Sequence, residues 1–332
     1  MDELVSSKHP ALFHYTSVDA FRSICEGHRL WATHYQDLND GSELQQFRGI
    51  VSEAIVPDLR TIFQDRVEAD AEFAERVRRN GGIKAVVDQE AAMWLDNLHR
   101  NTFGPGAFEN TFIFSFCAHA PDSYAWRHGL LSQWRAYGNG APIAMVLDTR
   151  GVEDLMKYER ETFAHPINHI GEVYYDDAPG IACLKADKDI SHIFKRLPQM
   201  LEEFYRSNTE ADIRDLMGPF IHGSTLVKHQ GFREESEFRI VVSPAPGPES
   251  DLHNPQREAK ERKPMRYRPR GNGEARYIEL FGQTKLPLER IIIGPSRAQN
   301  LNIQIVSELV AKHYPEVDIS RFISRSETPL LD

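Results

Sequence analysis

Residues 111–117, Thr-Phe-Ile-Phe-Ser-Phe-Cys, form the segment that decides the fold class. Phenylalanines at every second position alternate with Ile113, Ser115 and Cys117, which predicts a strand with substantial side chains on both faces. The preceding segment, residues 43–100, carries apolar side chains at helical spacing and predicts a helical block. A strand that follows directly on a helical block indicates a protein that combines a sheet with helices.

Further strands and helices are expected on both sides of this segment. Strand patterns cover residues 12–15, 30–32, 143–147, 172–175, 238–242, 276–280 and 290–293, and helical patterns cover 187–206, 210–226 and 298–313. Thr16, followed by Asp19, predicts a capping box that starts a helix ending near Gly27. Because these elements do not alternate as a βαβ series, the expected class is α+β rather than doubly wound α/β.

The chain offers no linker that would divide it, so residues 1–332 are expected to form a single elaborated domain. Residues 244–273 are rich in Pro, Gly and charge, and predict a long irregular loop. Seven basic residues and two acidic residues lie between Arg257 and Arg270. Such a run is either a solvated, mobile loop or a contact for nucleic acid or a dinucleotide phosphate.

Composition and charge limit the class of protein. The 332 residues are 41% hydrophobic and 27% charged, and 39 Lys+Arg against 49 Asp+Glu give a net charge of −10. An acidic chain repels polyanions, which disfavours non-specific nucleic-acid binding over the whole surface. No apolar run approaches the roughly 20 residues that span a bilayer. The N-terminus lacks a signal-peptide layout and the three cysteines form no CxxC pair, so a cytoplasmic protein is expected.

Several common catalytic motifs are absent from the sequence. It contains no GxGxxG, GxxxxGK[ST], GxSxG or HExxH. His165 and His169 are four residues apart, but Pro166 between them argues against a shared helical metal-binding face. No metal site is therefore expected.

Two polar segments occur at predicted element boundaries. His14-Tyr15-Thr16-Ser17 lies where a strand meets a helix N-terminus, whose free N–H groups can meet a hydroxyl or phosphate. Alternatively, Thr16 only caps the helix and His14 and Tyr15 are half-buried. Residues 131–138, Leu-Ser-Gln-Trp-Arg-Ala-Tyr-Gly, gather many hydrogen-bonding groups before a glycine. Alternatively, Trp134 packs inward and Arg135 is solvated.

A third polar segment opens the strand at 238–242. In an extended chain Glu235, Glu237 and Arg239 point to one face. Two carboxylates on one face repel each other, which raises the proton affinity of one and suits it to proton transfer. The alternative is an edge strand with a solvated charged face, in which Arg239 bridges the acids.

Taken in order, these segments resemble a known family. Seven motifs carry the resemblance: FHYTS (13–17), LW (30–31), LND (38–40) with Glu43 after it, FSFC (114–117), LSQWRAYG (131–138), KHQGFREESEFRIV (228–241) and IIIGP (291–295). They resemble the bacterial family called domain of unknown function 2971, from about Leu12 to Pro295. The family name itself implies no activity.

That family is similar, in turn, to ADP-ribosyltransferase-like folds. Their motifs follow the order His or Arg on a first strand, a Ser or Tyr in a middle motif, and Glu on a later strand. Here the resemblance places them on His14, on Ser132 or Tyr137, and on Glu237. The segment 235–237 also has the ExE form of several such transferases, whereas the middle motif lacks their Ser-Thr-Ser. The resemblance implies mixed or antiparallel split sheets with NAD in the cleft.

The resemblance also implies roles for these residues. Glu237 would stabilise the positive charge that builds on the ribose when the nicotinamide bond breaks, and Glu235 would serve the acceptor. His14 would fix a ribose hydroxyl, with Tyr15 and Thr16 beside it. In the middle motif Ser132, Trp134, Arg135 and Tyr137 would bind the dinucleotide, an aromatic ring stacking on the nicotinamide. All three motifs are then expected to converge around one pocket.

The resulting expectation is an ADP-ribosyltransferase-like enzyme that uses NAD as donor to modify a macromolecule, either nucleic acid or protein. Such an enzyme would act as a toxin or an anti-phage defence effector. One alternative is a non-enzymatic module that binds a nucleotide or a partner. A weaker alternative is a metal-dependent nuclease that uses Glu235 and Glu237.

Overall fold

The computed structural model of the chain describes residues 4–38, 43–138, 140–207, 209–245, 260–271 and 273–329. The strands within these ranges are Ala11–Ser17 (β1), Arg29–His34 (β2), Phe112–Cys117 (β3), Pro142–Asp148 (β4), Ile167–Glu172 (β5), Tyr174–Tyr175 (β6), Val227–Lys228 (β7), Glu237–Ser243 (β8), Arg266–Arg270 (β9), Gly273–Phe281 (β10), Leu288–Ile293 (β11) and Ile323–Arg325 (β12).

The helices of the described chain surround these strands. They are Val5–Lys8 (α1), Val18–Gly27 (α2), Glu43–Ala69 (α3), Ala71–Arg79 (α4), Gly82–Phe103 (α5), Tyr124–His128 (α6), Leu131–Tyr137 (α7), Thr149–Thr162 (α8), Ala178–Ala186 (α9), Ser191–Ser207 (α10), Arg214–Leu226 (α11), Gln299–His313 (α12) and Ile319–Phe322 (α13), with 3-10 turns at Tyr35–Asp37 (η1) and Gln230–Glu235 (η2). The chain is therefore α+β, as expected.

The main sheet divides at β3. One edge of β3 pairs with β8 along its whole length, from Phe112 to Cys117. The other edge is shared, because β1 meets it only at Cys117 and β2 meets it only at Phe112 and Ile113. The first arm continues from β1 through β4 and β11 to β12, and the second from β2 through β10 to β9. The pairs are antiparallel except β11 with β12, so the sheet is mixed.

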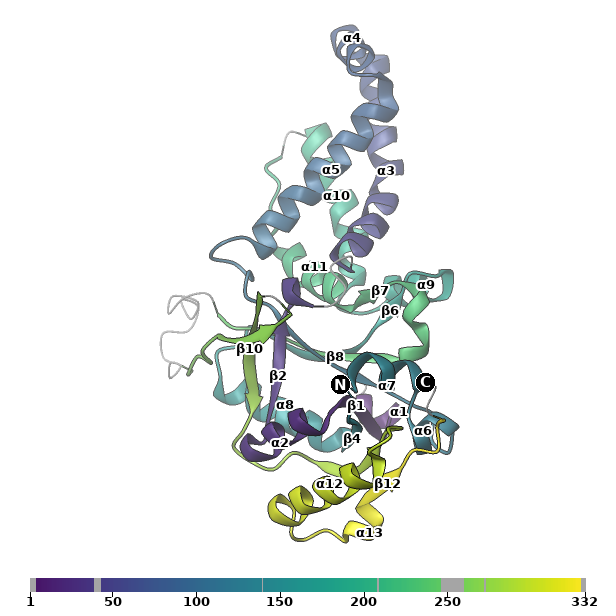
Figure 1. Ribbon diagram of the computed structural model, residues 1–332. Helices are drawn as coiled ribbons and strands as arrows, with labels where there is room; N and C mark the ends of the chain where they lie inside the picture. The colour runs from purple at the N-terminus through teal and green to yellow at the C-terminus, as the bar shows by residue number, and fades with distance from the viewer. Residues whose placement is uncertain are drawn as a thin grey trace.

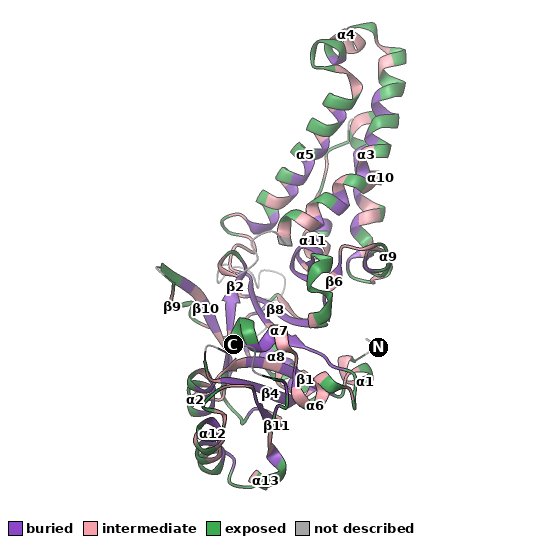
Figure 2. Ribbon diagram, turned by 45° about the vertical axis from the view of Figure 1, so that its right-hand side comes forward, coloured by how far each residue is buried: buried purple, intermediate pink, exposed green. Residues whose placement is uncertain are grey.

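The two faces of this sheet have different coverings. The face that carries Leu12, here the Leu12 face, packs against α2, α8 and α12 in a large apolar core. Because side chains opposite each other in a pair share a face, Phe13, Cys117 and Glu237 lie together on the other side, here the Glu237 face. Helix α7 covers one part of the Glu237 face through Trp134. Figure 2 shows the strands as largely buried.

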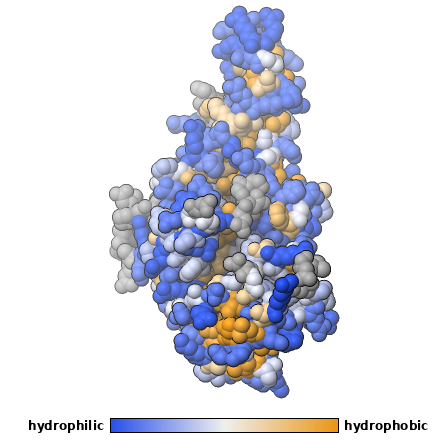
Figure 3. Space-filling view, viewed as in Figure 1, coloured by the Kyte–Doolittle hydropathy of each residue, from blue (hydrophilic) through white to orange (hydrophobic). Residues whose placement is uncertain are grey.

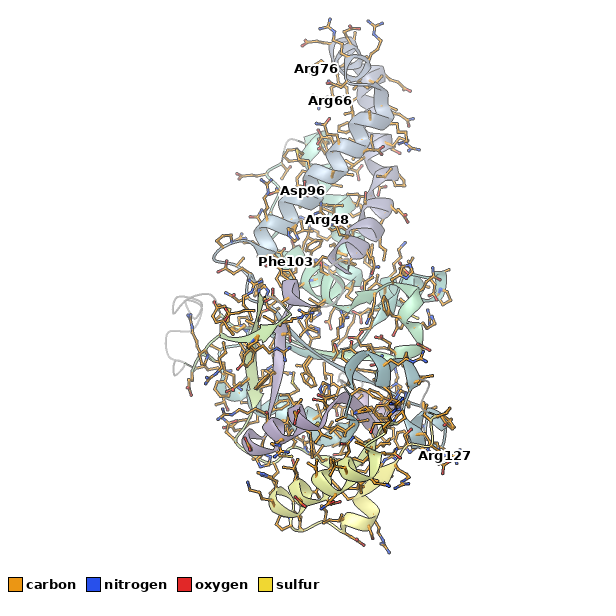
Figure 4. All side chains as sticks on the ribbon, viewed as in Figure 1. Arg48, Arg66, Arg76, Asp96, Phe103 and Arg127 are labelled. Carbon is orange, nitrogen blue, oxygen red and sulfur yellow. The ribbon has the colours of Figure 1, made fainter. Side chains whose placement is uncertain are left out.

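The helical block covers another part of the Glu237 face. Helices α3, α5, α10 and α11 share an apolar core that includes the sheet residues Ile113 and Val241. Figure 1 shows α3, α4, α5 and α10 extending from the sheet as an arm. Figure 4 shows Arg48 and Asp96 between α3 and α5, where they form an ion pair. The helical block expected at residues 43–100 is confirmed, and α10 and α11 complete it.

The surface agrees with the polar composition. Figure 3 shows a largely hydrophilic arm and an orange apolar patch low in the view. Among the residues described, no helix combines the length and the apolar character needed to cross a membrane.

Three expectations about local structure need correction. Ser17, not Thr16, caps α2, because its Oγ accepts a hydrogen bond from the Ala20 N–H at 3.2 Å. The expected irregular loop contains β9, which pairs with β10 in a hairpin. Helix α8 was not expected at all. The part of the expected loop at residues 246–259 lies outside the described residues.

Candidate functional site

A cluster of two carboxylates and two cations lies on the Glu237 face. Glu237 opens β8 and is 4% exposed. Its Oε1 accepts a hydrogen bond from Nε of Arg239 at 2.8 Å, and its Oε2 accepts from Nζ of Lys228 at 2.8 Å. The same ammonium donates to Oε2 of Glu235 at 2.7 Å. Lys228 therefore bridges the two carboxylates.

The local backbone explains how Glu235 reaches this cluster. Residues 230–235 form η2 rather than a strand, and Ser236 has left-handed backbone angles with φ 44°. The chain therefore turns before β8 begins, and the expected extended segment starts at Glu237. The expected solvated edge is wrong, because β8 lies between β3 and β5 and all its residues are buried. Glu237 and Arg239 share a face, as expected.

The pKa of Glu237 is lowered, whereas two carboxylates that repel each other were expected to raise it in one of the pair. Burial raises the pKa of Glu237, but the charges of Arg239 and Lys228 outweigh it and lower the pKa to about 2. Burial disfavours the charged form of Lys228, but Glu237 and Glu235 raise its pKa above the ordinary value. Glu237 and Lys228 are therefore both charged at neutral pH. The formal charges of the two carboxylates, Lys228 and Arg239 sum to zero, so the cluster presents no net negative charge.

Tyrosine and cysteine side chains surround the cluster. The Glu237 backbone N–H donates a hydrogen bond to the Tyr175 hydroxyl at 3.1 Å. Cys117 lies opposite Glu237 on β3, and burial raises the pKa of its thiol well above the ordinary value. Burial and the charge of Glu235 also raise the pKa of Tyr137. The structure thus brings residues of the 131–138 segment and the 231–239 segment together.

Within α7, the expected binding residues have different surroundings. Trp134 is buried, packs edge-on against Tyr15 at 4.7 Å and donates from Nε1 to the His128 carbonyl at 3.1 Å. Its ring belongs to the core and cannot stack on a ligand. Ser132 Oγ is buried and has no hydrogen-bond partner among the described residues. Arg135 is exposed, and Tyr137, at 41% exposure, is the accessible aromatic ring of the helix.

His14 does not join this cluster. Strand alternation directs it to the Leu12 face, away from Glu237. Its ring packs on Phe114 at 4.4 Å, and its Nδ1–H donates to the Ser115 carbonyl at 3.1 Å. Burial lowers its pKa to about 4, so the ring is neutral at pH 7. The expected convergence of three motifs therefore fails for His14.

Tyr15 and Thr16, the neighbours of His14 in the first motif, lie on opposite faces of the sheet. Tyr15 is buried on the Glu237 face, where its hydroxyl shares a hydrogen bond of 2.6 Å with Nε2 of His119 and accepts from the Leu130 N–H at 2.9 Å. Thr16 alternates back toward the Leu12 face and is partly buried. Tyr15 thus helps to hold α7 on the sheet.

The basic run is less exposed than expected. Lys263 is almost fully buried, forms an ion pair with Glu159 and donates to the Glu279 carbonyl at 2.7 Å. Arg268 on β9 is partly buried and donates to the Thr33 hydroxyl at 2.9 Å. Residues 257–259 of the run lie outside the described residues.

Lys228 is the site residue that the sequence interpretation missed. It begins the motif KHQGFREESEFRIV at residues 228–241, but a lysine nine residues before Glu237 gives no sign of pairing with it. The pairing arises because β7 and η2 fold back beside β8. Tyr175, which lies on β6 beside β7, was missed for the same reason.

Comparison with known proteins gives one match. Residues 133–240, about a third of the chain, match the model of a family described as Protein of unknown function (DUF2971). Neither a search of curated proteins nor a search of solved structures returns a match. The matched segment runs from α7 into β8 and contains Tyr137, Lys228, Glu235 and Glu237. Over this segment the chain is similar to the family of proteins of unknown function DUF2971.

Proposed function

We propose that the protein is a nucleotide-binding module whose ligand contacts Glu235 and Tyr137 at the rim of the charged cluster. One observation carries this proposal. Glu235 uses only Oε2 on Lys228, and its Oε1 makes no hydrogen bond with any described residue. Its side chain is 14% exposed and is held by the Lys228 ammonium, so Oε1 is a fixed acceptor at the surface. Such an acceptor suits the hydroxyl groups of a ribose.

The charge balance of the cluster favours binding over turnover. A carboxylate that stabilises positive charge on a ribose must present that charge to the reacting atoms. Both oxygens of Glu237 are engaged by cations, and its side chain is almost inaccessible. The neutral cluster therefore supplies a rigid frame for Glu235 rather than an open negative charge.

The position of His14 also favours a binding module over a transferase. An ADP-ribosyltransferase built on His14 and Glu237 needs both side chains on one ligand. Strand alternation places them on opposite faces, and the His14 ring already uses Nδ1 on the Ser115 carbonyl. The set of residues implied by the resemblance is therefore incomplete on the Glu237 face.

A second candidate remains the ADP-ribosyltransferase-like enzyme with NAD as donor. Two observations favour it: Glu237 stays ionised, and β1 and β8, which carry the first and the third motif, both pair with β3. In that case NAD would have to displace Lys228 or Arg239 from Glu237. The nuclease reading is weaker, because the Lys228 ammonium occupies the position between Glu235 and Glu237 where a metal ion would bind.

Titration calorimetry with NAD, combined with an assay of nicotinamide release, separates these candidates. The binding module predicts saturable binding with intact NAD. Glu235→Gln should weaken binding by about 10- to 100-fold, since a hydrogen bond to a charged group contributes about 1.5–3 kcal/mol. Glu234→Gln is the matched control, because Glu234 is exposed on the same turn. Nicotinamide release by the wild-type protein would support the transferase, and binding unaffected by Glu235→Gln would refute the proposed site.

A further inference from the structure

The second arm of the sheet carries a guanidinium that lacks a carboxylate partner within the described residues. Arg268 on β9 donates from Nη2 to the Thr33 hydroxyl at 2.9 Å. No Asp or Glu of the described chain lies within ion-pair distance of it. Burial lowers the pKa of Arg268, and the nearby charge of Arg270 lowers it further. Arg268 is thus a partly desolvated cation that has no counter-charge in the described part of the chain.

Two aromatic rings hold this guanidinium in place. Trp31 on β2 and Tyr277 on β10 lie with ring centroids 4.7 Å apart. The guanidinium carbon of Arg268 lies 5.7 Å from the Trp31 centroid and 6.0 Å from that of Tyr277. A guanidinium has five N–H donors, of which one is used on Thr33. The remaining donors can form the paired hydrogen bonds that phosphate oxygens accept.

The basic side chains that line a nearby pocket already form ion pairs with carboxylates. A pocket on the same arm is lined by Arg29, Lys263, Arg266 and Glu279. Glu279 lies 2.9 Å from Nη1 of Arg29 and 3.4 Å from Nε of Arg266, and Lys263 pairs with Glu159. The cations of this pocket are thus paired with carboxylates, whereas Arg268 has no such partner among the residues that the structure describes.

We propose that Arg268, together with Thr33 and Trp31, is the phosphate-binding subsite of this protein. The idea that this phosphate belongs to a nucleotide rests on the proposed function. The affinity of the subsite for a phosphate group, in contrast, depends only on these three residues. Thr33 pairs with Ile113 of β3, and Glu237 pairs with Cys117 of the same strand. Both pairs lie on the Glu237 face. The two pairing positions on β3 are four residues, or about 13 Å, apart along the strand, and β2 and β8 lie on opposite edges of β3, about 10 Å across the sheet. One extended dinucleotide can span this separation.

Titration calorimetry with pyrophosphate, ADP and adenosine tests this subsite. Arg268→Gln should weaken pyrophosphate and ADP binding by about 10- to 100-fold, the range for one charge-assisted hydrogen-bonding group, and should leave adenosine unaffected. Arg268→Lys keeps the charge without the planar fork and should give an intermediate loss. Arg262→Gln is the matched control, because Arg262 is exposed in the same basic segment. Thermal unfolding of each variant verifies folding.

The outcomes separate the two proposals. Arg268-dependent pyrophosphate binding without any nucleotide binding would support the subsite and refute the nucleotide-binding function. Nucleotide binding that both Arg268 variants retain in full would refute the subsite and leave the function standing. Failure of the wild-type protein to bind pyrophosphate, together with Arg268-dependent binding of single-stranded RNA, would overturn the subsite in favour of a nucleic-acid surface.

Discussion

Lys228 and Glu237 form a buried ion pair, with 2.8 Å between Nζ and Oε2, although they belong to different strands. Each residue alone would be costly to bury, because a charge loses its hydration inside a protein. Together with Arg239 and Glu235 they form a cluster of four charges that compensate one another. This pairing makes Glu237 a structural group and leaves Glu235 as the accessible carboxylate.

The first prediction concerns stability. Glu237→Gln should lower the free energy of unfolding by about 3–5 kcal/mol, since it leaves Arg239 and Lys228 buried without their shared carboxylate. Urea denaturation measures the change. Glu234→Gln, on the exposed turn, should stay within about 0.5 kcal/mol of the wild type. Equal stability of Glu237→Gln and the wild type would show that the cluster does not stabilise the fold.

The second prediction concerns pH. The pKa of Glu237 is about 2 in the folded protein, against an ordinary value of 4.5. Because the unfolded chain takes up this proton first as pH falls, the stabilisation by Glu237 is fully present above pH 4.5 and declines toward pH 2. The difference in unfolding free energy between the wild type and Glu237→Gln should therefore shrink over this interval. A difference that stays constant from pH 6 to pH 2.5 would contradict the ion pairing.

The third prediction concerns the anchoring of α7. Trp134→Ala should destabilise the protein by about 3–5 kcal/mol, the usual cost of removing a large buried aromatic ring. Arg135→Ala, at an exposed position of the same helix, is the control and should change stability by less than about 0.5 kcal/mol. Denaturation of both variants decides the point. A loss below about 1 kcal/mol for Trp134→Ala would mean that the indole is not a core residue.

The fourth prediction concerns the rim of the proposed site. Tyr137→Phe removes one hydroxyl from a partly exposed ring, so stability should barely change. Affinity for NAD should fall by about 3- to 10-fold, the equivalent of one neutral hydrogen bond. Calorimetry measures the affinity, and Tyr124→Phe, another exposed tyrosine, serves as the control. Unchanged affinity in Tyr137→Phe would remove this residue from the site.

Much of the fold follows from local pattern. The strands β3, β4 and β8 and the helices α3, α5 and α12 have apolar side chains at the spacing of their secondary structure, so they are predictable from sequence. Strand β9 reads Arg-Tyr-Arg-Pro-Arg and has no such pattern. It is a strand because its backbone pairs with β10, and a tertiary contact of that kind leaves no local signal.

The site was predictable only in part. Glu235, Glu237 and Tyr137 were expected near one another and lie near one another. The face on which His14 lies depends on the register that pairs Phe13 with Cys117, and a shift of one residue would reverse it. Sequence spacing cannot fix such a register. For the same reason the contact between Lys228 and both carboxylates appears only in three dimensions.

The most direct test is a crystal structure of the protein with NAD bound. We predict intact NAD on the Glu237 face, with a ribose hydroxyl within hydrogen-bond distance of Glu235 Oε1. We also predict a phosphate oxygen within hydrogen-bond distance of the Arg268 guanidinium. NAD on the Leu12 face beside His14, or cleaved nicotinamide beside a Glu237 released from Lys228 and Arg239, would contradict these predictions.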